Sequence, residues 1–191
     1  MTTTALIVVD VQLGFDDPSW GRSSNPEAEQ RIDRLVRAWE ERGWPVVVIR
    51  HDSIEPDSPL RPDRPGNELK AFLHGKGSVT VSKHAHSAFH GSPDLHGWLR
   101  EHGIDRVAVT GITTNHCCET TARVACDLGY DVTFVWDATR TFDRAAPDGT
   151  VVAADQLMTM TRTNLADEFA RVLDTDAVLA ELPSPAPATT D

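Results

Sequence analysis

The stretch DRVAVTGITTNHCCET, residues 105–120, predicts a buried strand that turns directly into a helix. Its first part, DRVAVTG (105–111), is a short apolar run of the kind that forms a buried parallel strand. The following segment, 115–129, carries small side chains at helical spacing and ends at a glycine, which commonly terminates a helix. A strand that leads into a helix is the repeating unit of an α/β fold.

The same alternation extends over the rest of the chain. Further strands are predicted at ALIVVD (5–10), PVVVIR (45–50), SVTVSK (78–83), DVTFVWDA (131–138) and a short run at 169–173. Further helices are predicted from Pro26, with Asn25 as N-cap, to Gly43, and at 94–103 and 149–165. The pattern predicts one α/β domain over residues 1–182, doubly wound around a mainly parallel sheet with helices on both faces. The tail, 183–191, is predicted to be disordered.

Composition limits the classes of function. The 191 residues carry a formal net charge of −11, which disfavours a nucleic-acid or anionic-membrane partner. The sequence has no apolar run near the ~20 residues of a membrane span, and its start lacks signal-peptide features, so a cytoplasmic location is expected. The chain has three cysteines, an odd number, which argues against a framework of disulfides. A reactive thiol is the alternative to consider.

Reactive side chains stand at three predicted strand ends. Asp10 ends the first strand, Lys83 ends the third, and the fourth runs through Gly111 into the cysteine pair. In a parallel sheet these ends lie at one edge, where ligands bind. A carboxylate, an ammonium and a thiol would supply a proton carrier, a cation that lowers the thiol pKa, and a nucleophile. The N-terminus of the helix near Asn115 is expected to favour thiolate further.

Helical geometry distinguishes the adjacent cysteines. Cys118 shares one stripe of small residues with Ala122, Ala125 and Gly129, and this stripe is expected to pack on the sheet. Cys117 lies about 100° around the helix from that stripe and faces the strand ends. We therefore predict that Cys117 is the nucleophile and that Cys118 fills the core. Cys126, further along the helix, is predicted to be structural.

Three segments resemble one known superfamily. They are VVDVQLGF (8–15), KHAHSAF (83–89) and GITTNHCCETTA (111–122). Together they resemble the isochorismatase-like cysteine hydrolases, which include nicotinamidase and N-carbamoylsarcosine amidohydrolase. The resemblance extends from Ala5 to about Leu173. It implies a catalytic triad of Asp10, Lys83 and Cys117.

The resemblance also implies a mechanism. A cis peptide between Ile112 and Thr113 would aim the backbone N–H groups of Thr113 and Cys117 at one point, forming an oxyanion hole. Cys117 would attack an amide, lactam or carbamoyl carbon of a small-molecule substrate, and Asp10 would move the proton. Members are commonly oligomers, so a homo-dimer or homo-tetramer is expected. Trp44, Trp98 and Trp136 would serve an interface or the core.

Four residues are predicted to line the substrate pocket, namely Phe15, Trp20, His51 and Phe89. Trp20 lies in FDDPSWGRSSNP (15–26), which would form either a lid or an ordinary surface loop. Asn115 and His116 are interpreted as helix-capping residues. Nicotinamidases bind a metal through an Asp-x-His pattern, but here the segment reads RHDS (50–53). No metal and no cofactor are therefore expected, and nicotinamide is disfavoured as substrate.

Two alternatives remain open at this stage. Isochorismatase-type hydrolysis of a vinyl ether needs an acid but no nucleophile, and Asp10 could supply the proton. A non-catalytic binding protein that keeps the fold is the other alternative. The presence of Asp10, Lys83 and Cys117 together counts against it.

Overall fold

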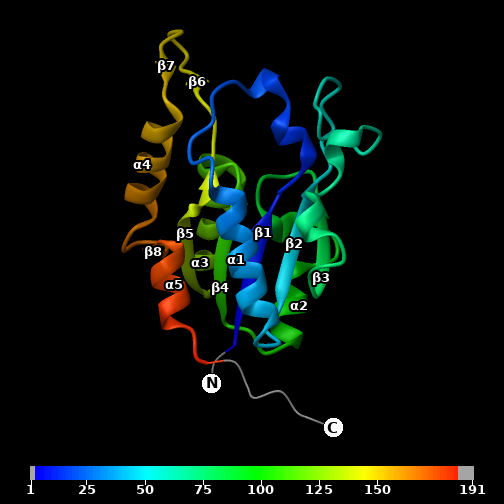
Figure 1. Cartoon of the computed structure of the whole chain (residues 1–191), viewed down its shortest axis with the longest axis vertical. Coiled ribbons are helices and arrows are strands. Elements are labelled where there is room, and N and C mark those ends of the chain that lie inside the picture. Colours follow the sequence, from blue (N-terminus) through cyan, green and yellow to red (C-terminus); the bar gives the residue numbers. More distant parts are fainter. Residues whose placement is uncertain (1–2, 185–191) are drawn as a thin grey trace.

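The computed structural model of the chain describes residues 3–184. Within them, six parallel strands form one sheet in the order β3–β2–β1–β4–β5–β8 (Figure 1). The strands are β1 (Thr4–Val9), β2 (Val46–His51), β3 (Val79–Lys83), β4 (Arg106–Ile112), β5 (Asp131–Arg140) and β8 (Arg171–Leu173). The predicted parallel α/β class is confirmed. Most of the tail predicted to be disordered, residues 185–191, lies outside the described residues.

The central strand β1 is buried on both faces. Ala5, Ile7 and Val9 belong to one core, while Leu6 and Val8 belong to the other. Successive side chains of a strand point to opposite faces, so a continuous apolar run suits a strand that is covered on both sides.

Helices cover both faces of the sheet (Figure 1). Helices α1 (Ala28–Glu40) and α5 (Thr175–Glu181) pack on the core that contains Leu6. Helices α2 (Leu95–Glu101), α3 (Glu119–Asp127) and α4 (Ala154–Leu165) pack on the opposite core. The tryptophans whose role was left open are partly buried, and each packs against one of the two cores: Trp44, Trp98 and Trp136. No helix within residues 3–184 is long and apolar enough to cross a membrane.

The start of α1 differs from the prediction. The helix begins at Ala28, and Glu27 occupies the N-cap position. Asn25 instead has a left-handed backbone, with φ of 44°, and its Nδ2 donates to the carbonyl oxygens of Asp137 and Thr139. Asparagine tolerates this conformation better than most residues. Its side chain therefore joins the loop to the end of β5 and does not cap a helix.

Two other helix starts are later than predicted. An irregular π-type turn, Thr114–Cys118, precedes α3. The last long helix begins at Ala154 because the residues before it form a small hairpin, in which β6 (Arg144–Ala145) pairs antiparallel with β7 (Val151–Val152). This hairpin stands at the carboxyl end of the sheet (Figure 1).

Gly111 allows β4 to lie close to β1 just before the reactive turn. It pairs with Val9, and its φ of 124° is one that L side chains rarely adopt. A Cβ at this position would lie 2.1 Å from the carbonyl oxygen of Val9. Only glycine fits there without moving the backbone.

Candidate active site

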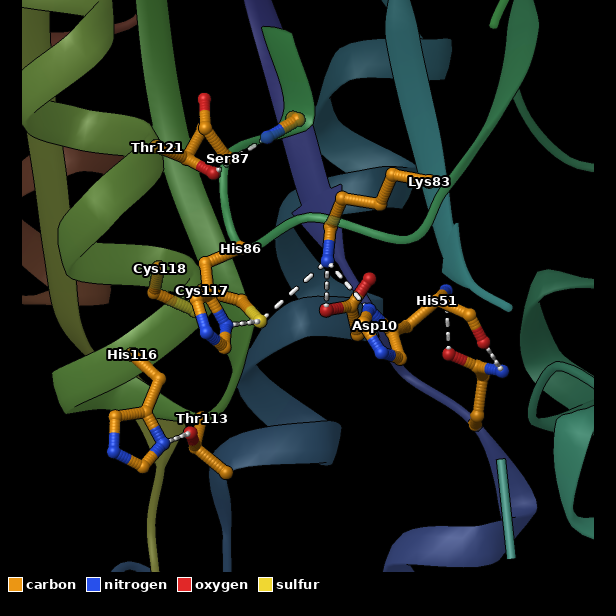
Figure 2. Close-up of polar contacts among 12 residues, drawn as sticks. Asp10, His51, Lys83, His86, Ser87, Thr113, His116, Cys117, Cys118 and Thr121 are labelled. Carbon is orange, nitrogen blue, oxygen red and sulfur yellow. Dashed lines mark hydrogen bonds and ion pairs between the residues drawn. The ribbon is translucent and has the colours of Figure 1, made fainter. Parts of the chain in front are cut away.

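The carboxyl ends of three strands bring Asp10, Lys83 and Cys117 together (Figure 2). Nζ of Lys83 donates a hydrogen bond of 2.7 Å to Oδ2 of Asp10 and lies 3.4 Å from Sγ of Cys117. Asp10 and Lys83 are each only 1% exposed. Asp10 has a left-handed backbone, with φ of 51°, which aspartate tolerates better than most residues. The structure thus places the three predicted reactive groups at one point, although they come from distant segments.

His51 is a further partner of the Lys83 ammonium. Its Nδ1 lies 3.2 Å from Nζ of Lys83 (Figure 2). Gln12, which is fully buried, holds the histidine backbone from both sides: its Oε1 accepts from the His51 N–H at 2.9 Å, and its Nε2 donates to the His51 carbonyl at 3.0 Å. The three N–H bonds of the ammonium therefore have three acceptors, on Asp10, His51 and Cys117.

The expected lowering of the thiol pKa is wrong. Burial raises the pKa of Cys117 to about 12, the Asp10 carboxylate raises it further, and Lys83 opposes these effects without outweighing them. Burial also raises the pKa of Asp10, against the effect of Lys83. For Lys83, burial lowers the pKa, but the neighbouring Asp10 and Cys117 raise it above its ordinary value. The proton therefore resides on the thiol until it is transferred.

One oxygen of Asp10 is available for that transfer. Among the described residues, Oδ1 of Asp10 is buried and has no hydrogen-bond partner, although Oδ2 is bound by Lys83. A carboxylate oxygen of Asp10 and Sγ of Cys117 lie within 4.8 Å of each other. A buried acceptor without a partner is energetically unfavourable, and an incoming proton would satisfy it.

The neighbouring cysteines lie elsewhere. Cys118 is fully buried against the sheet with Ala122 and Ala125, as predicted, and burial raises its pKa well above the ordinary value. Cys126 is only half-buried, and its Sγ lies 3.9 Å from the carbonyl oxygen of Glu168. Of the three thiols, Cys117 is the one that lines the cavity at the strand ends.

This cavity has a volume of about 460 Å³ and contains Asp10, Thr113 and Cys117 in its lining. The peptide bond between Ile112 and Thr113 is cis. One wall is aromatic and consists of Phe15, Trp20 and Phe142. The centroid of the Trp20 ring lies 5.1 Å from that of Phe15 and 5.3 Å from that of Phe142, and the two phenylalanine rings are 6.2 Å apart. Nε1 of Trp20 donates to the carbonyl of Gly14 at 2.8 Å, which holds the indole in place.

Three of the four predicted pocket residues line this cavity: Phe15, Trp20 and His51. Phe89 does not. Phe89 lies in a short helical turn, Ala88–His90, that Ser87 caps: Oγ of Ser87 accepts a hydrogen bond of 3.2 Å from the N–H of Phe89. The ring then stacks on Tyr130, with centroids 5.7 Å apart, and packs against the core under α2 and α3.

Several lining residues were not predicted. His86 places Nδ1 3.9 Å from Sγ of Cys117, and His116 places Nδ1 3.2 Å from Oγ1 of Thr113. His116 and Asn115 do not cap a helix as predicted, since Oδ1 of Asn115 accepts from Thr141. The segment that follows β5 contributes Thr141, Phe142 and, from β6, Arg144 to the lining. Ligands of parallel sheets bind at the carboxyl ends of the strands, so the residues after the fifth predicted strand could have been included as candidates from the sequence.

By type and spacing, Asp10, His51 and Cys117 could hold a metal ion, since their donor atoms lie within 4.8 Å of one another. In this structure each of the three residues already has one such atom hydrogen-bonded to the ammonium of Lys83: Oδ2 of Asp10, Nδ1 of His51 and Sγ of Cys117. A metal bound through these same atoms would have to displace that ammonium. The donor set therefore fits an internal lysine better than an added cation.

Comparisons with known proteins agree with this fold. The Isochorismatase domain model matches residues 4–177. The chain is 36% identical over 176 residues to the uncharacterized isochorismatase family protein YrdC of Bacillus subtilis, covering 92% of this chain and 94% of that protein. It is 38% identical over 194 residues to nicotinamidase 3 of Arabidopsis thaliana, with coverages of 93% and 88%.

A solved structure gives the same assignment. An isochorismatase-family protein from Chromobacterium violaceum matches with a TM-score of 0.87 and 37% identity, covering 93% of this chain and 92% of that one. The class of protein is thus a hydrolase built on a parallel α/β sheet. The chain belongs to the isochorismatase family.

Proposed function

We propose that this protein is a cysteine hydrolase that cleaves a C–N bond in a small amide, lactam or carbamoyl compound. The observation that carries the proposal is the arrangement of Asp10, Lys83 and Cys117 in the lining of one cavity, with Nζ of Lys83 2.7 Å from Asp10 and 3.4 Å from the sulfur. Similarity to a nicotinamidase, a relative named for hydrolysis of an amide, supports the same reaction class.

The first half of the reaction forms an acyl-enzyme. Sγ of Cys117 attacks the carbonyl carbon while its proton moves to Oδ1 of Asp10, the carboxylate oxygen without a partner among the described residues. The carbonyl electron pair moves onto oxygen, where the backbone N–H groups of Thr113 and Cys117 stabilise the negative charge. Asp10 then gives the proton to the leaving nitrogen, the C–N bond breaks, and a thioester remains.

Water completes the cycle. Asp10 takes a proton from water, the hydroxide oxygen attacks the thioester, the C–S bond breaks, and the proton returns to sulfur. Lys83 keeps its charge throughout, because its pKa is raised, and it compensates the negative charge that moves between Asp10 and Cys117. Acid–base assistance of this kind typically contributes about 10²–10⁴-fold to a rate.

A second candidate is hydrolysis of a vinyl ether with Asp10 as the acid. Its support is the raised pKa of Asp10, caused by burial, which helps the carboxyl to hold a proton. This reaction requires no nucleophile, so it would survive removal of the Cys117 thiol.

The test is a screen of amide, lactam, carbamoyl and vinyl-ether compounds against the wild type, Cys117→Ala and Cys118→Ala. Intact-mass measurement during turnover, followed by peptide mapping, would locate a covalent adduct. We expect an acyl group on Cys117, activity in Cys118→Ala and none in Cys117→Ala. Turnover that persists in Cys117→Ala would favour acid catalysis. An adduct on Cys118 with Cys117 unmodified would overturn the assignment of the nucleophile.

A further inference from the structure

The guanidinium of Arg144 stands out among the cationic side chains of the protein. The chain has 18 lysines and arginines, all within residues 3–184. Within that part of the chain, only the side chains of Arg100 and Arg144 have no hydrogen bond, ion pair or aromatic ring as partner. The other cationic side chains bind acids, carbonyls or, for Arg162, the ring of Trp136. Of these two residues, only Arg144 lines the cavity that contains Cys117.

Asp143, the acid that precedes Arg144 in the sequence and also lines the cavity, does not pair with it. Oδ1 of Asp143 is bound by Arg22 at 3.1 Å and by the N–H of Ala154 at 2.7 Å. The position of Arg144 itself is held by the hairpin, in which it pairs with Val152. The hairpin thus places an exposed cation in the cavity lining, while Asp143 binds Arg22 and the N–H of Ala154.

Arg144 differs from the other charged groups around the cavity, which are ion-paired. Asp10 is paired with Lys83, and Asp143 is paired with Arg22, which also binds Asp155. His51 is neutral near pH 7, because burial and the Lys83 charge lower its pKa to about 4. Burial and then the charge of Arg144 lower the pKa of His116, which also lines the cavity. Arg144 is therefore the one cationic side chain in the lining without an acidic partner among the described residues, in a chain whose net charge is −11.

We propose that Arg144 binds an anionic group, a carboxylate, of the substrate at the end remote from the scissile carbonyl. This inference rests on the proposed function. An arginine presents a planar fork of donors that matches a carboxylate, and the aromatic wall of Phe15, Trp20 and Phe142 would cover the apolar part of the same molecule. The preferred substrates would then be amides that carry a carboxylate.

The first test uses reagents that differ only in charge, so the natural substrate is not required. Rates of alkylation of Cys117 by iodoacetate and iodoacetamide, and by N-(2-carboxyethyl)maleimide and N-propylmaleimide, are measured at pH 9 by peptide mass mapping. We expect the ratio of the anionic to the neutral rate to fall about tenfold in Arg144→Gln, as for loss of one charged hydrogen-bonding group. Arg144→Lys should keep most of the ratio, and the matched control Arg100→Gln should keep all of it. An unchanged ratio in Arg144→Gln overturns the proposal.

The second test does not depend on a reactive thiol. Phenylacetate and phenylacetamide are titrated calorimetrically into Cys117→Ala, with and without Arg144→Gln. We expect Arg144→Gln to weaken phenylacetate about tenfold and to leave phenylacetamide unchanged. Equal effects on both ligands overturn the proposal for Arg144. A thiol at position 117 that resists all four reagents counts against the proposed function instead, and the titration still decides the role of Arg144.

Discussion

Nζ of Lys83 lies 3.2 Å from Nδ1 of His51. The imidazole is thus a third hydrogen-bond partner of the ammonium, beside Asp10 and Cys117. An ammonium can only donate, and Nδ1 must therefore be the unprotonated nitrogen of a neutral ring. The ring proton is then on Nε2. In this way Lys83 sets the tautomer of a residue that lines the substrate cavity.

Replacing His51 tests whether it positions Lys83. In His51→Asn, the amide oxygen can occupy the place of Nδ1 and accept from the ammonium, whereas His51→Leu leaves one N–H without an acceptor. We expect His51→Leu to lower kcat about 10–100-fold, the equivalent of one hydrogen bond to a charged group, and His51→Asn to recover most of this loss. The measurement is steady-state kinetics on any amide that the wild type turns over. Equal losses in both variants would assign His51 to substrate contact alone.

The same histidine predicts a dependence of stability on pH. Its pKa is about 4 in the folded protein, mainly because of burial, against 6.5 for the free side chain. Between these values the unfolded chain binds the proton and the folded one does not, so the free energy of unfolding falls as the pH drops from about 6.5 towards 4. Urea denaturation at pH 7 and pH 5 should show a smaller fall for His51→Asn than for the wild type. A difference of the opposite sign would mean that the folded protein holds His51 as an imidazolium.

The thiol pKa predicts how alkylation depends on pH. Because burial raises the pKa of Cys117 to about 12, the thiolate fraction should increase about tenfold for each pH unit above 7. The rate of iodoacetamide labelling at Cys117 should therefore still be rising at pH 10. Mass mapping separates this rate from that of the half-buried Cys126, which serves as an internal reference. A plateau reached by pH 7 would instead indicate a thiolate stabilised by Lys83.

The two adjacent cysteines should respond differently to truncation. Cys118→Ala removes a fully buried sulfur and should lower the free energy of unfolding by about 1 kcal/mol while keeping activity. Cys117→Ala should abolish amide hydrolysis and leave the circular dichroism spectrum unchanged. Chemical denaturation and a kinetic assay on the same two samples make the comparison. Greater loss of activity in Cys118→Ala than in Cys117→Ala would reverse the roles assigned to them.

Gly111 should be far less replaceable than an exposed glycine with positive φ. Gly111→Ala brings a Cβ to 2.1 Å from the carbonyl oxygen of Val9, and we expect it to cost more than about 4 kcal/mol or to prevent folding. Gly103→Ala is the matched control, since φ there is 63° but nothing lies within 4 Å of the added carbon. It should cost about 1 kcal/mol. Denaturant titrations that give similar values for both would show that backbone conformation, and not the approach of β1, determines the effect.

The sequence predicts burial correctly where neighbouring residues form a regular hydrophobic pattern. The apolar run that became β1 and the small-residue stripe of Cys118, Ala122 and Ala125 are examples, because burial on a sheet imposes a period that is visible in the chain. Asn25 and Phe89 were misplaced. Asn25 binds carbonyls of β5 more than a hundred residues away, and Phe89 turns towards Tyr130, so no local pattern determines either position.

The amino-acid pattern alone was enough to predict the parallel α/β class and the meeting of Asp10, Lys83 and Cys117 at one edge. Hydrophobic periodicity identifies the strands, and the carboxyl ends of parallel strands share an edge. The folded arrangement was needed to learn the protonation state of the thiol, the position of His51 beside Lys83, and that Arg144 forms no ion pair with any acid in residues 3–184. These properties depend on burial and on distances between charges, and both exist only once distant segments have packed together.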